Sequence, residues 1–174
     1  ILKEIPKEER VKLRASLSYP EESAGRLMQR EYVSVRKSWS VGNIIDFLRS
    51  GKELPEDFYD IFVVDSKKKL VGSVPLSRVL RSKRALPVSK IMEASSLRIS
   101  AAMDQEEVAF LFRKRNLTSS PVINKKEELV GVITIDDVVD VIDEEAGEDI
   151  MRLGGVVEDD FYGAVMDTTK SRFR

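Results

Sequence analysis

The sequence predicts an α/β fold in which two copies of one unit pack against each other with pseudo-two-fold symmetry. The segment Ile61–Leu80 matches Ser120–Val139 at a constant offset of 59 residues, and Leu27–Leu48 matches Ile91–Phe112 at an offset of 64 residues. Each copy alternates short apolar runs with segments of helical periodicity. Because a unit of about 60 residues buries little apolar surface alone, we expect both copies to share one domain.

The elements of the first copy follow from local patterns, in chain order. "YVSVR" (Tyr32–Arg36) predicts a short strand, and Ser40 precedes a helix with apolar residues at helical spacing. The runs "IFVVD" and "LVGSV" flank a lysine-rich turn and predict a β-hairpin, which leads into a short helix. The second copy repeats this order with "LRIS", a helix after Asp104, and the hairpin "SPVIN" and "LVGVI".

The segment Asp136–Gly155 predicts a further helix of unusual charge. Residues 136–160 contain 11 acidic residues and one basic residue, whereas residues 1–135 are net basic. Carboxylates three or four residues apart on a helix repel each other by roughly 0.2–0.5 kcal/mol per pair. Gly147 weakens the helix further, by up to about 1 kcal/mol relative to alanine. We therefore expect cations to neutralise this face.

The composition excludes several classes of protein. The chain has 174 residues, 42% of them hydrophobic, and no cysteine or histidine, so disulfides, thiolate nucleophiles and histidine bases are absent. A bound metal would have oxygen ligands, which favours Mg²⁺, Ca²⁺ or Mn²⁺. Basic residues are scattered without interleaved aromatics, which argues against nucleic-acid binding. The chain begins at Ile1 and ends in "TTKSRFR", so we interpret it as part of a longer protein.

The second copy carries a resemblance to a known family. Its "PVINKKEELVGVITIDDVV" is similar to a CBS motif, with Gly131, Thr134 and Asp137 at the characteristic positions. Two such copies in tandem form a Bateman domain pair. The first copy departs from the motif, because Pro75 stands in place of the threonine and Arg78 in place of the aspartate.

The flanking segments resemble a more specific family. "YPEESAGRLM" (Tyr19–Met28) and "EEAGEDIMRLGGV" after Asp143 are similar to signatures of MgtE-type magnesium transporters. This resemblance implies a C-terminal piece of a helical N domain at 1–18, the first CBS motif at 19–86, the second at 87–145, and a connecting (plug) helix at 146–174. It also implies an absent transmembrane pore domain, a full-length protein in the cell membrane with this region on the cytoplasmic side, and a homodimer formed through the CBS domains.

The resemblance also implies a regulatory Mg²⁺ site made of carboxylates, through which the pore is gated. Carried over position by position, its ligands are Asp137, Asp140, Glu145, Glu148 and Asp149, with Asp104 and Glu106 as further candidates. Asp104 is also a candidate helix N-cap. Another acidic position of the family falls on Asn116, which cannot supply a carboxylate.

Two alternatives remain open. CBS pairs commonly bind adenosine nucleotides, and Thr134 and Asp137 permit this in the second copy, so the chain is alternatively a nucleotide-sensing module of another protein. The acids that follow Asp137 would repel phosphates, and we expect ATP to bind weakly or not at all. A carboxylate-based enzyme is the other alternative, but no residue spacing demands one, and we expect no catalytic activity. Trp39 is expected to serve core or dimer-interface packing.

Overall fold

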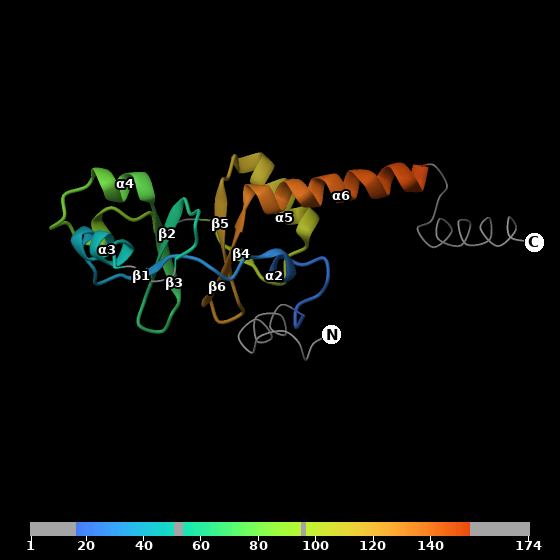
Figure 1. Ribbon diagram of the computed structural model, residues 1–174. Coiled ribbons are helices and arrows are strands. Elements are labelled where there is room, and N and C mark those ends of the chain that lie inside the picture. The colour runs from blue at the N-terminus through green and yellow to red at the C-terminus, as the bar shows by residue number, and fades with distance from the viewer. Residues whose placement is uncertain (1–16, 51–53, 95–96, 154–174) are drawn as a thin grey trace, which may run out of the picture.

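The computed structural model describes residues 17–50, 54–94 and 97–153, and it confirms the predicted α/β class (Figure 1). The first half contains β1 (Ser34–Arg36), α3 (Val41–Leu48), β2 (Asp60–Val64), β3 (Leu70–Pro75), α4 (Leu76–Arg81) and the 3₁₀ helix η1 (Val88–Lys90). The second half contains β4 (Ile99–Ser100), α5 (Gln105–Arg115), β5 (Ser119–Ile123), β6 (Leu129–Thr134) and α6 (Ile135–Leu153), and a short helix α2 (Ala24–Leu27) comes before both halves. In these ranges no helix combines the length and the apolar character that crossing a bilayer requires.

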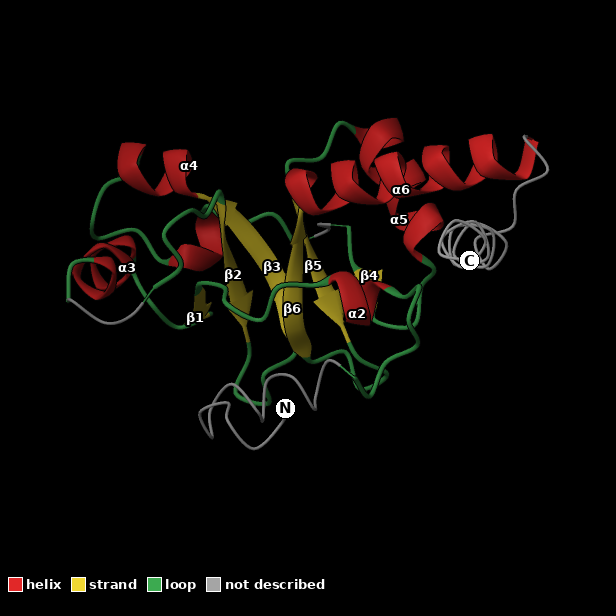
Figure 2. Cartoon of the chain, turned by 45° about the vertical axis from the view of Figure 1, so that its right-hand side comes forward, coloured by secondary structure: helices red, strands yellow, loops and turns green. Residues whose placement is uncertain are grey.

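Each half is built on a three-stranded sheet, ordered β1-β2-β3 in the first and β4-β5-β6 in the second. The outer strand is parallel to its neighbour in both sheets, and the hairpin strands are antiparallel. Gly72 pairs with Val63, and Gly131 pairs with Val122, with a register shift directly after both pairs. Figure 2 separates the two halves, with α3 and α4 beside the first sheet and α2, α5 and α6 beside the second.

The two hairpin turns also share one conformation. Asp65 in the first turn and Asn124 in the second accept hydrogen bonds from the backbone N–H groups two and four residues further along the chain. Lys68 and Glu127, which correspond in the repeat, both have positive φ, at 62° and 63°. A short acceptor side chain that bonds its own backbone stabilises a tight turn, so an aspartate or asparagine begins both turns.

The helix starts follow the predicted caps. Ser40 and Asn43 form a reciprocal capping box at α3, in which the Ser40 backbone N–H donates to Asn43 Oδ1 at 3.0 Å and the Asn43 N–H donates to Ser40 Oγ at 3.2 Å. The Asp104 carboxylate accepts the Glu106 N–H at 2.8 Å, which confirms Asp104 as the N-cap of α5. Each cap satisfies helix N–H groups that would otherwise have no partner.

Two chain segments cross between the halves. The segment that precedes β1 packs on the second half, where the Ala24 N–H donates to the Met103 carbonyl at 2.7 Å. The segment that precedes β4 packs on the first half, where the Val88 N–H donates to the Trp39 carbonyl at 2.8 Å. These two hydrogen bonds occupy equivalent positions of the repeat. The structure therefore extends the internal symmetry to the two segments that connect the halves, including the short helices α2 and η1.

The crossing segments continue as single β-bridges onto the hairpins. Gln29 exchanges two backbone hydrogen bonds with Val132, at 2.8 and 2.9 Å, and Glu93 exchanges two with Ser73, at 2.8 and 3.1 Å. The first bridge lies beside Gly131 and the second beside Gly72, the glycines at equivalent positions of the two hairpins. The crossing segments thus tie each half to the chain that leads into the other.

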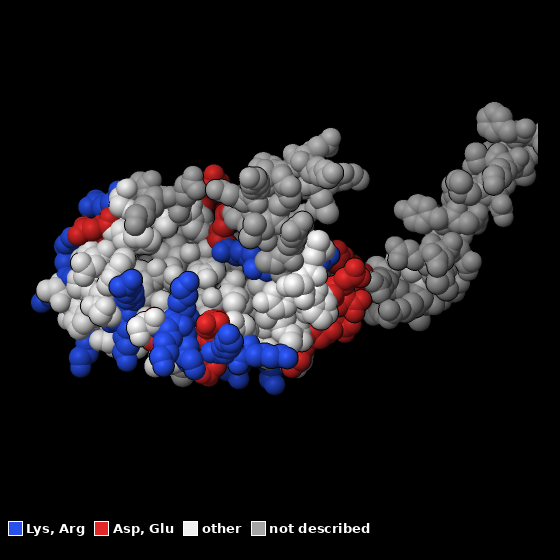
Figure 3. All heavy atoms as spheres, turned by 90° about the horizontal axis from the view of Figure 1, so that it is seen from below, with Lys and Arg blue, Asp and Glu red and all other residues white. Residues whose placement is uncertain are grey.

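Charges are segregated along the molecule. In the view of Figure 3, basic side chains spread along the first half and the middle, and acidic side chains gather toward the end that belongs to the second half.

The predicted N-domain piece up to residue 16 and the predicted connecting helix beyond residue 153 lie outside the described residues, and the predicted domain boundaries remain predictions.

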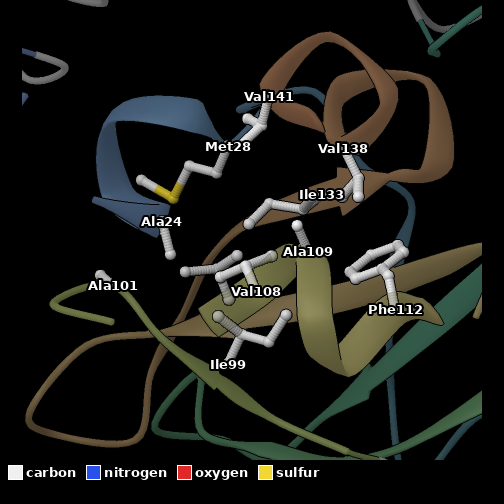
Figure 4. Packing of buried hydrophobic residues seen from close by; sticks show 11 residues of the cluster. Ala24, Met28, Ile99, Ala101, Val108, Ala109, Phe112, Ile133, Val138 and Val141 are labelled. Carbon is white, nitrogen blue, oxygen red and sulfur yellow. The ribbon is translucent and has the colours of Figure 1, made fainter. Parts of the chain in front are cut away.

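The core of each half lies between its sheet and its helices. In the second half Ala24 and Met28 of the crossing segment pack with residues from the sheet and from both long helices (Figure 4). These include Ile99, Val108, Phe112, Ile133, Val138 and Val141. In the first half Trp39 packs with its ring edge against Phe47, with centroids 5.5 Å apart, which confirms its predicted packing role.

Two glycine substitutions are expected to change stability in opposite directions. A Cβ added at Gly131 would lie 2.6 Å from Met28 Sδ and 2.7 Å from the Gln29 carbonyl oxygen, whereas at Gly147 it meets nothing within 4 Å. Gly131→Ala should therefore lower the free energy of unfolding by about 1–3 kcal/mol. Gly147→Ala, in the interior of α6, should raise it by about 0.5–1 kcal/mol. Urea unfolding of the two variants measures both changes, and equal effects would contradict the packing described.

Candidate functional site

Helix α6 presents three different faces. Val138 and Val141 are buried in the second-half core, at 1% and 2% exposure. A second face carries exposed apolar side chains at helical spacing, namely Ile135, Val139, Ile142 and Ile150. A third face carries the exposed acids Asp136, Asp140, Asp143 and Glu144. None of the ion pairs between described residues involves an acid of α6, so its charge is compensated by no described base at ion-pair distance.

The predicted metal ligands of α6 lie along successive turns of this helix. Asp140 is exposed, and Glu145, half-buried, accepts a hydrogen bond from Gln105 Nε2 at 3.3 Å. The backbones of Glu148 and Asp149 continue the same helix, but their side chains lie outside the described residues.

The Gln105–Glu145 hydrogen bond joins the start of α5 to the middle of α6. Gln105 lies between Asp104 and Glu106, the two further ligands that were predicted, and both of these acids are exposed. The structure therefore brings carboxylates from two separate helices to one region. In the ranges that the structure describes, no three acidic side chains are close enough to hold a metal ion between them.

Asp137 closes the start of α6. Its Oδ2 accepts hydrogen bonds from the Thr134 N–H at 2.8 Å and from Thr134 Oγ1 at 2.9 Å. Gln29 Nε2 donates to both carboxylate oxygens, at 3.0 and 3.1 Å, and also contacts Thr134 Oγ1 at 3.2 Å. An acid three residues after the N-cap that accepts the N-cap N–H completes half of a capping box. The two residues predicted for nucleotide binding thus bond each other and Gln29.

A narrow cleft lies between the two halves next to these residues. Thr134, Tyr32 and Asp60 are on its walls, and its free volume is about 20 Å³. That volume suits about one water molecule. Asp60 Oδ2 accepts a hydrogen bond from the Ser119 hydroxyl at 2.6 Å across the cleft. These two residues occupy equivalent positions of the repeat but carry different side chains. Burial raises the pKa of the Tyr32 phenol, against a smaller lowering by Arg30, so the hydroxyl stays protonated and donates to the Leu129 carbonyl at 3.1 Å.

The equivalent place in the first half contains an ion pair. Arg78, which corresponds to Asp137, lies 2.6 Å from a carboxylate oxygen of Glu93 and donates to the Ile91 carbonyl at 3.0 Å. Glu93 corresponds to Gln29. Each crossing segment therefore supplies one side chain to the first turn of the helix that follows a hairpin. At α6 the amide of Gln29 bonds the acid Asp137, and at α4 the acid Glu93 pairs with the base Arg78.

Sequence reasoning missed Gln29, Glu93 and the Ser119–Asp60 hydrogen bond. The signal for the first two was present, because both follow a methionine at the offset of 64 residues. Their partners depend on the crossing of the chain segments, which no local pattern reports.

Comparisons with known proteins agree on one family. The CBS domain model matches residues 24–84 and 88–144. The magnesium transporter MgtE of Thermus thermophilus is 39% identical over 147 residues, 84% of this chain and 33% of that protein. MgtE of Bacillus subtilis is 31% identical over 143 residues, 82% of this chain and 32% of that protein. The chain thus spans about a third of the length of these relatives.

Solved structures show the same similarity. A crystal structure of the cytosolic domain of the Mg²⁺ channel MgtE in complex with ATP has a TM-score of 0.76 and 35% identity, and the match covers 80% of this chain and 56% of that one. The soluble part of a magnesium transporter has a TM-score of 0.78 and 30% identity, with 83% and 57% covered.

Replacing Asp137 is expected to destabilise the start of α6. Asp137→Ala removes the acceptor for the Thr134 N–H and for Gln29, and the free energy of unfolding should fall by about 1 kcal/mol. The neighbouring Asp136 is exposed and accepts no hydrogen bond from a described residue, so Asp136→Ala is the matched control. Thermal unfolding of both variants measures the difference, and an equal loss in both would show that only the charge near the helix start matters.

Proposed function

Because this chain belongs to the CBS-domain family and matches the cytosolic CBS region of MgtE magnesium transporters, we propose that it is the Mg²⁺-sensing regulatory region of such a transporter. The remaining two thirds of the protein would supply the N domain and the pore. In this proposal the region lies on the cytoplasmic side of the membrane and regulates the pore without catalysing a reaction. The predicted ligands Asp104, Glu106 and Asp140 are exposed rather than enclosed in a cleft, which supports a regulatory role.

The Gln105–Glu145 contact is the observation that supports this function most directly. It holds the acidic start of α5 against the acidic middle of α6, and none of the ion pairs between described residues involves an acid of α6. Carboxylate oxygens are the donors that Mg²⁺ prefers, and Mg²⁺ keeps several waters, so it needs only one or two protein carboxylates at each site. The residues present therefore fit a set of partly hydrated Mg²⁺ sites.

Regulation follows from the balance of charge on these helices. Any arrangement that moves the acids of α5 and α6 closer together raises their mutual repulsion and is disfavoured without cations. Mg²⁺ supplies the compensating positive charge when bound and so favours the more compact arrangement. A ligand shifts such an equilibrium only through its different affinity for the two states. In the full-length protein the compact state would hold the pore closed.

We further propose that the exposed apolar face of α6 packs against a second copy of the chain. Leu80 on α4 and Val139 on α6 occupy equivalent positions of the repeat, and both are exposed, at 67% and 47%. A two-fold partner would cover both positions with one self-complementary surface. On α6 the exposed apolar side chains Ile135, Val139, Ile142 and Ile150 recur at helical spacing, so they form a larger apolar surface than scattered single residues do.

A nucleotide-sensing role is the second candidate. The similar MgtE structure contains ATP, and Thr134, which donates a hydrogen bond to Asp137, lines the cleft between the halves. In this chain the cleft is narrow and Asp137 is already hydrogen-bonded by Gln29. Thermal shift separates the candidates, because stabilisation by Mg²⁺ alone supports metal sensing and stabilisation by ATP with a metal chelator present supports nucleotide sensing.

Mg²⁺ is expected to protect the acidic helix and the residues after it from proteolysis. With increasing Mg²⁺, cleavage within residues 143–174 should slow in the wild-type chain. A triple variant, Glu145→Ala, Glu148→Ala and Asp149→Ala, should lose most of this response without unfolding, because it removes like charges from one helix and so relieves their repulsion.

The matched control is a second triple variant, Asp136→Ala, Asp143→Ala and Glu144→Ala. It removes the same charge from the same helix at positions that are not predicted ligands, and it should keep the wild-type response. If both triple variants respond alike, the effect of Mg²⁺ is general charge screening and the proposed site is wrong.

Charged substitutions on the apolar face of α6 are expected to abolish dimer formation. Val139→Glu and Ile142→Glu change exposed side chains, so the monomer should keep its fold while its partner surface becomes charged. Light scattering coupled to gel filtration should show a dimer for the wild-type chain and a monomer for the double variant. Wild-type chain that remains monomeric at high concentration would refute this interface.

A further inference from the structure

A basic groove lies beside the first half, and Leu129 of the second half also lies on its wall. It runs beside the edge strand β1 and the turn that follows β2, and its volume is about 950 Å³. Pockets of roughly 300–1,000 Å³ accommodate small organic ligands. The groove shares only Tyr32 with the narrow cleft, and none of the predicted metal ligands lines it.

The charges of the groove are unbalanced. Arg36, Lys37 and Lys68 line it, all three are exposed, and none forms an ion pair or a side-chain hydrogen bond with another described residue. Asp65 is the acid of the lining, but its Oδ1 accepts the N–H groups of Lys67 and Lys69, at 2.7 and 2.9 Å. These hydrogen bonds hold the carboxylate within its own turn, and three basic side chains outnumber this one acid, so the lining favours an anion.

Two aromatic rings form part of the groove wall and are held in place. Tyr32 is fixed by the hydrogen bond to the Leu129 carbonyl and by an edge contact with Phe62, with centroids 6.4 Å apart. Trp39 is fixed by its edge contact with Phe47. Both are half-buried, so each ring contacts the core and also borders the groove. Rings that are already ordered contribute stacking area at low entropic cost.

The second half shows that the fold does not require this groove. Ser89 and Lys37 of the groove correspond to Gly25 and Ala101, and there the Tyr19 ring lies so close that a Cβ on Gly25 would collide with it. Tyr19 thus packs an aromatic ring onto the place that the first half leaves open. The position equivalent to Tyr19 is Lys83, whose exposed side chain brings no ring.

From these observations we infer that the groove beside β1 binds a small organic anion that carries an aromatic ring. The ring takes the place that Tyr19 fills in the second half, next to Trp39, and the phosphate or carboxylate lies among Arg36, Lys37 and Lys68. Hydroxyl groups of the groove, those of Ser38, Ser66 and Ser89, supply further donors. This site is independent of the proposed Mg²⁺ function.

The test uses phenyl phosphate as the probe and Trp39 as the reporter. Trp39 is the single tryptophan of the chain, so its indole N–H gives one cross-peak in an amide correlation spectrum. Titration of the full chain with phenyl phosphate should shift this peak and saturate. Phenol and inorganic phosphate, titrated separately, should each bind about tenfold or more weakly, because each retains only one of the two contacts.

The variant Arg36→Gln with Lys37→Gln should weaken phenyl phosphate binding by about tenfold or more. The matched control is Lys125→Gln with Lys126→Gln, which removes two exposed lysines from the other hairpin turn, outside the groove, and should bind as the wild type does. Equal weakening in both double variants, an unshifted indole peak, or equal affinity for phenyl phosphate and inorganic phosphate would each overturn the inference.

Discussion

The close approach of two backbones at Gly131, repeated at Gly72, is the constraint on which the rest of the molecule depends. At each glycine the crossing segment lies so near the hairpin that a Cβ would meet a backbone carbonyl oxygen, that of Gln29 or that of Glu93, within 2.7 Å. This approach permits the bridges that join the halves. It also fixes the positions of the Gln29 and Glu93 side chains. As a result Gln29 bonds Asp137 at the start of α6, and Glu93 pairs with Arg78 in α4.

The same backbone frame carries different chemistry in its two halves. At the start of α6 an amide of the crossing segment bonds an aspartate, and at the start of α4 a glutamate pairs with an arginine. Tyr19 packs beside Gly25 in one half, and basic side chains border an open groove at the equivalent place in the other. Side chains at equivalent positions of the repeat thus differ in charge, although the backbone contacts around them correspond. The symmetry is carried by the backbone contacts and does not depend on these side chains.

Much of the fold was predictable, because its signals are local. The apolar runs, the turn residues and the N-caps Ser40 and Asp104 lie within a few positions of the structure that they specify. The internal offsets then implied the symmetry. The site was predictable in part: Thr134 and Asp137 were identified by resemblance, but their mutual hydrogen bonds were not, although a threonine followed three residues later by an acid is a capping pattern. Contacts such as Ser119–Asp60 and Gln105–Glu145 depend on how distant segments pack, and no single stretch of sequence encodes them.

Helix α6 is anchored in the core at its N-terminal end alone among its described residues, so a small tilt moves its C-terminal end by a larger distance. Its buried side chains, Val138 and Val141, lie in its first two turns, and no side chain described after Val141 is buried. The 12 residues from Ile142 to Leu153 extend about 18 Å beyond that anchor, at about 1.5 Å per residue. A tilt of about 10° at the anchored end displaces the far end by about 3 Å over such a length. Glu145 contacts Gln105 about one turn after the buried residues. A small change in the angle between α5 and α6 at this contact therefore becomes a larger displacement at the C-terminal end of α6.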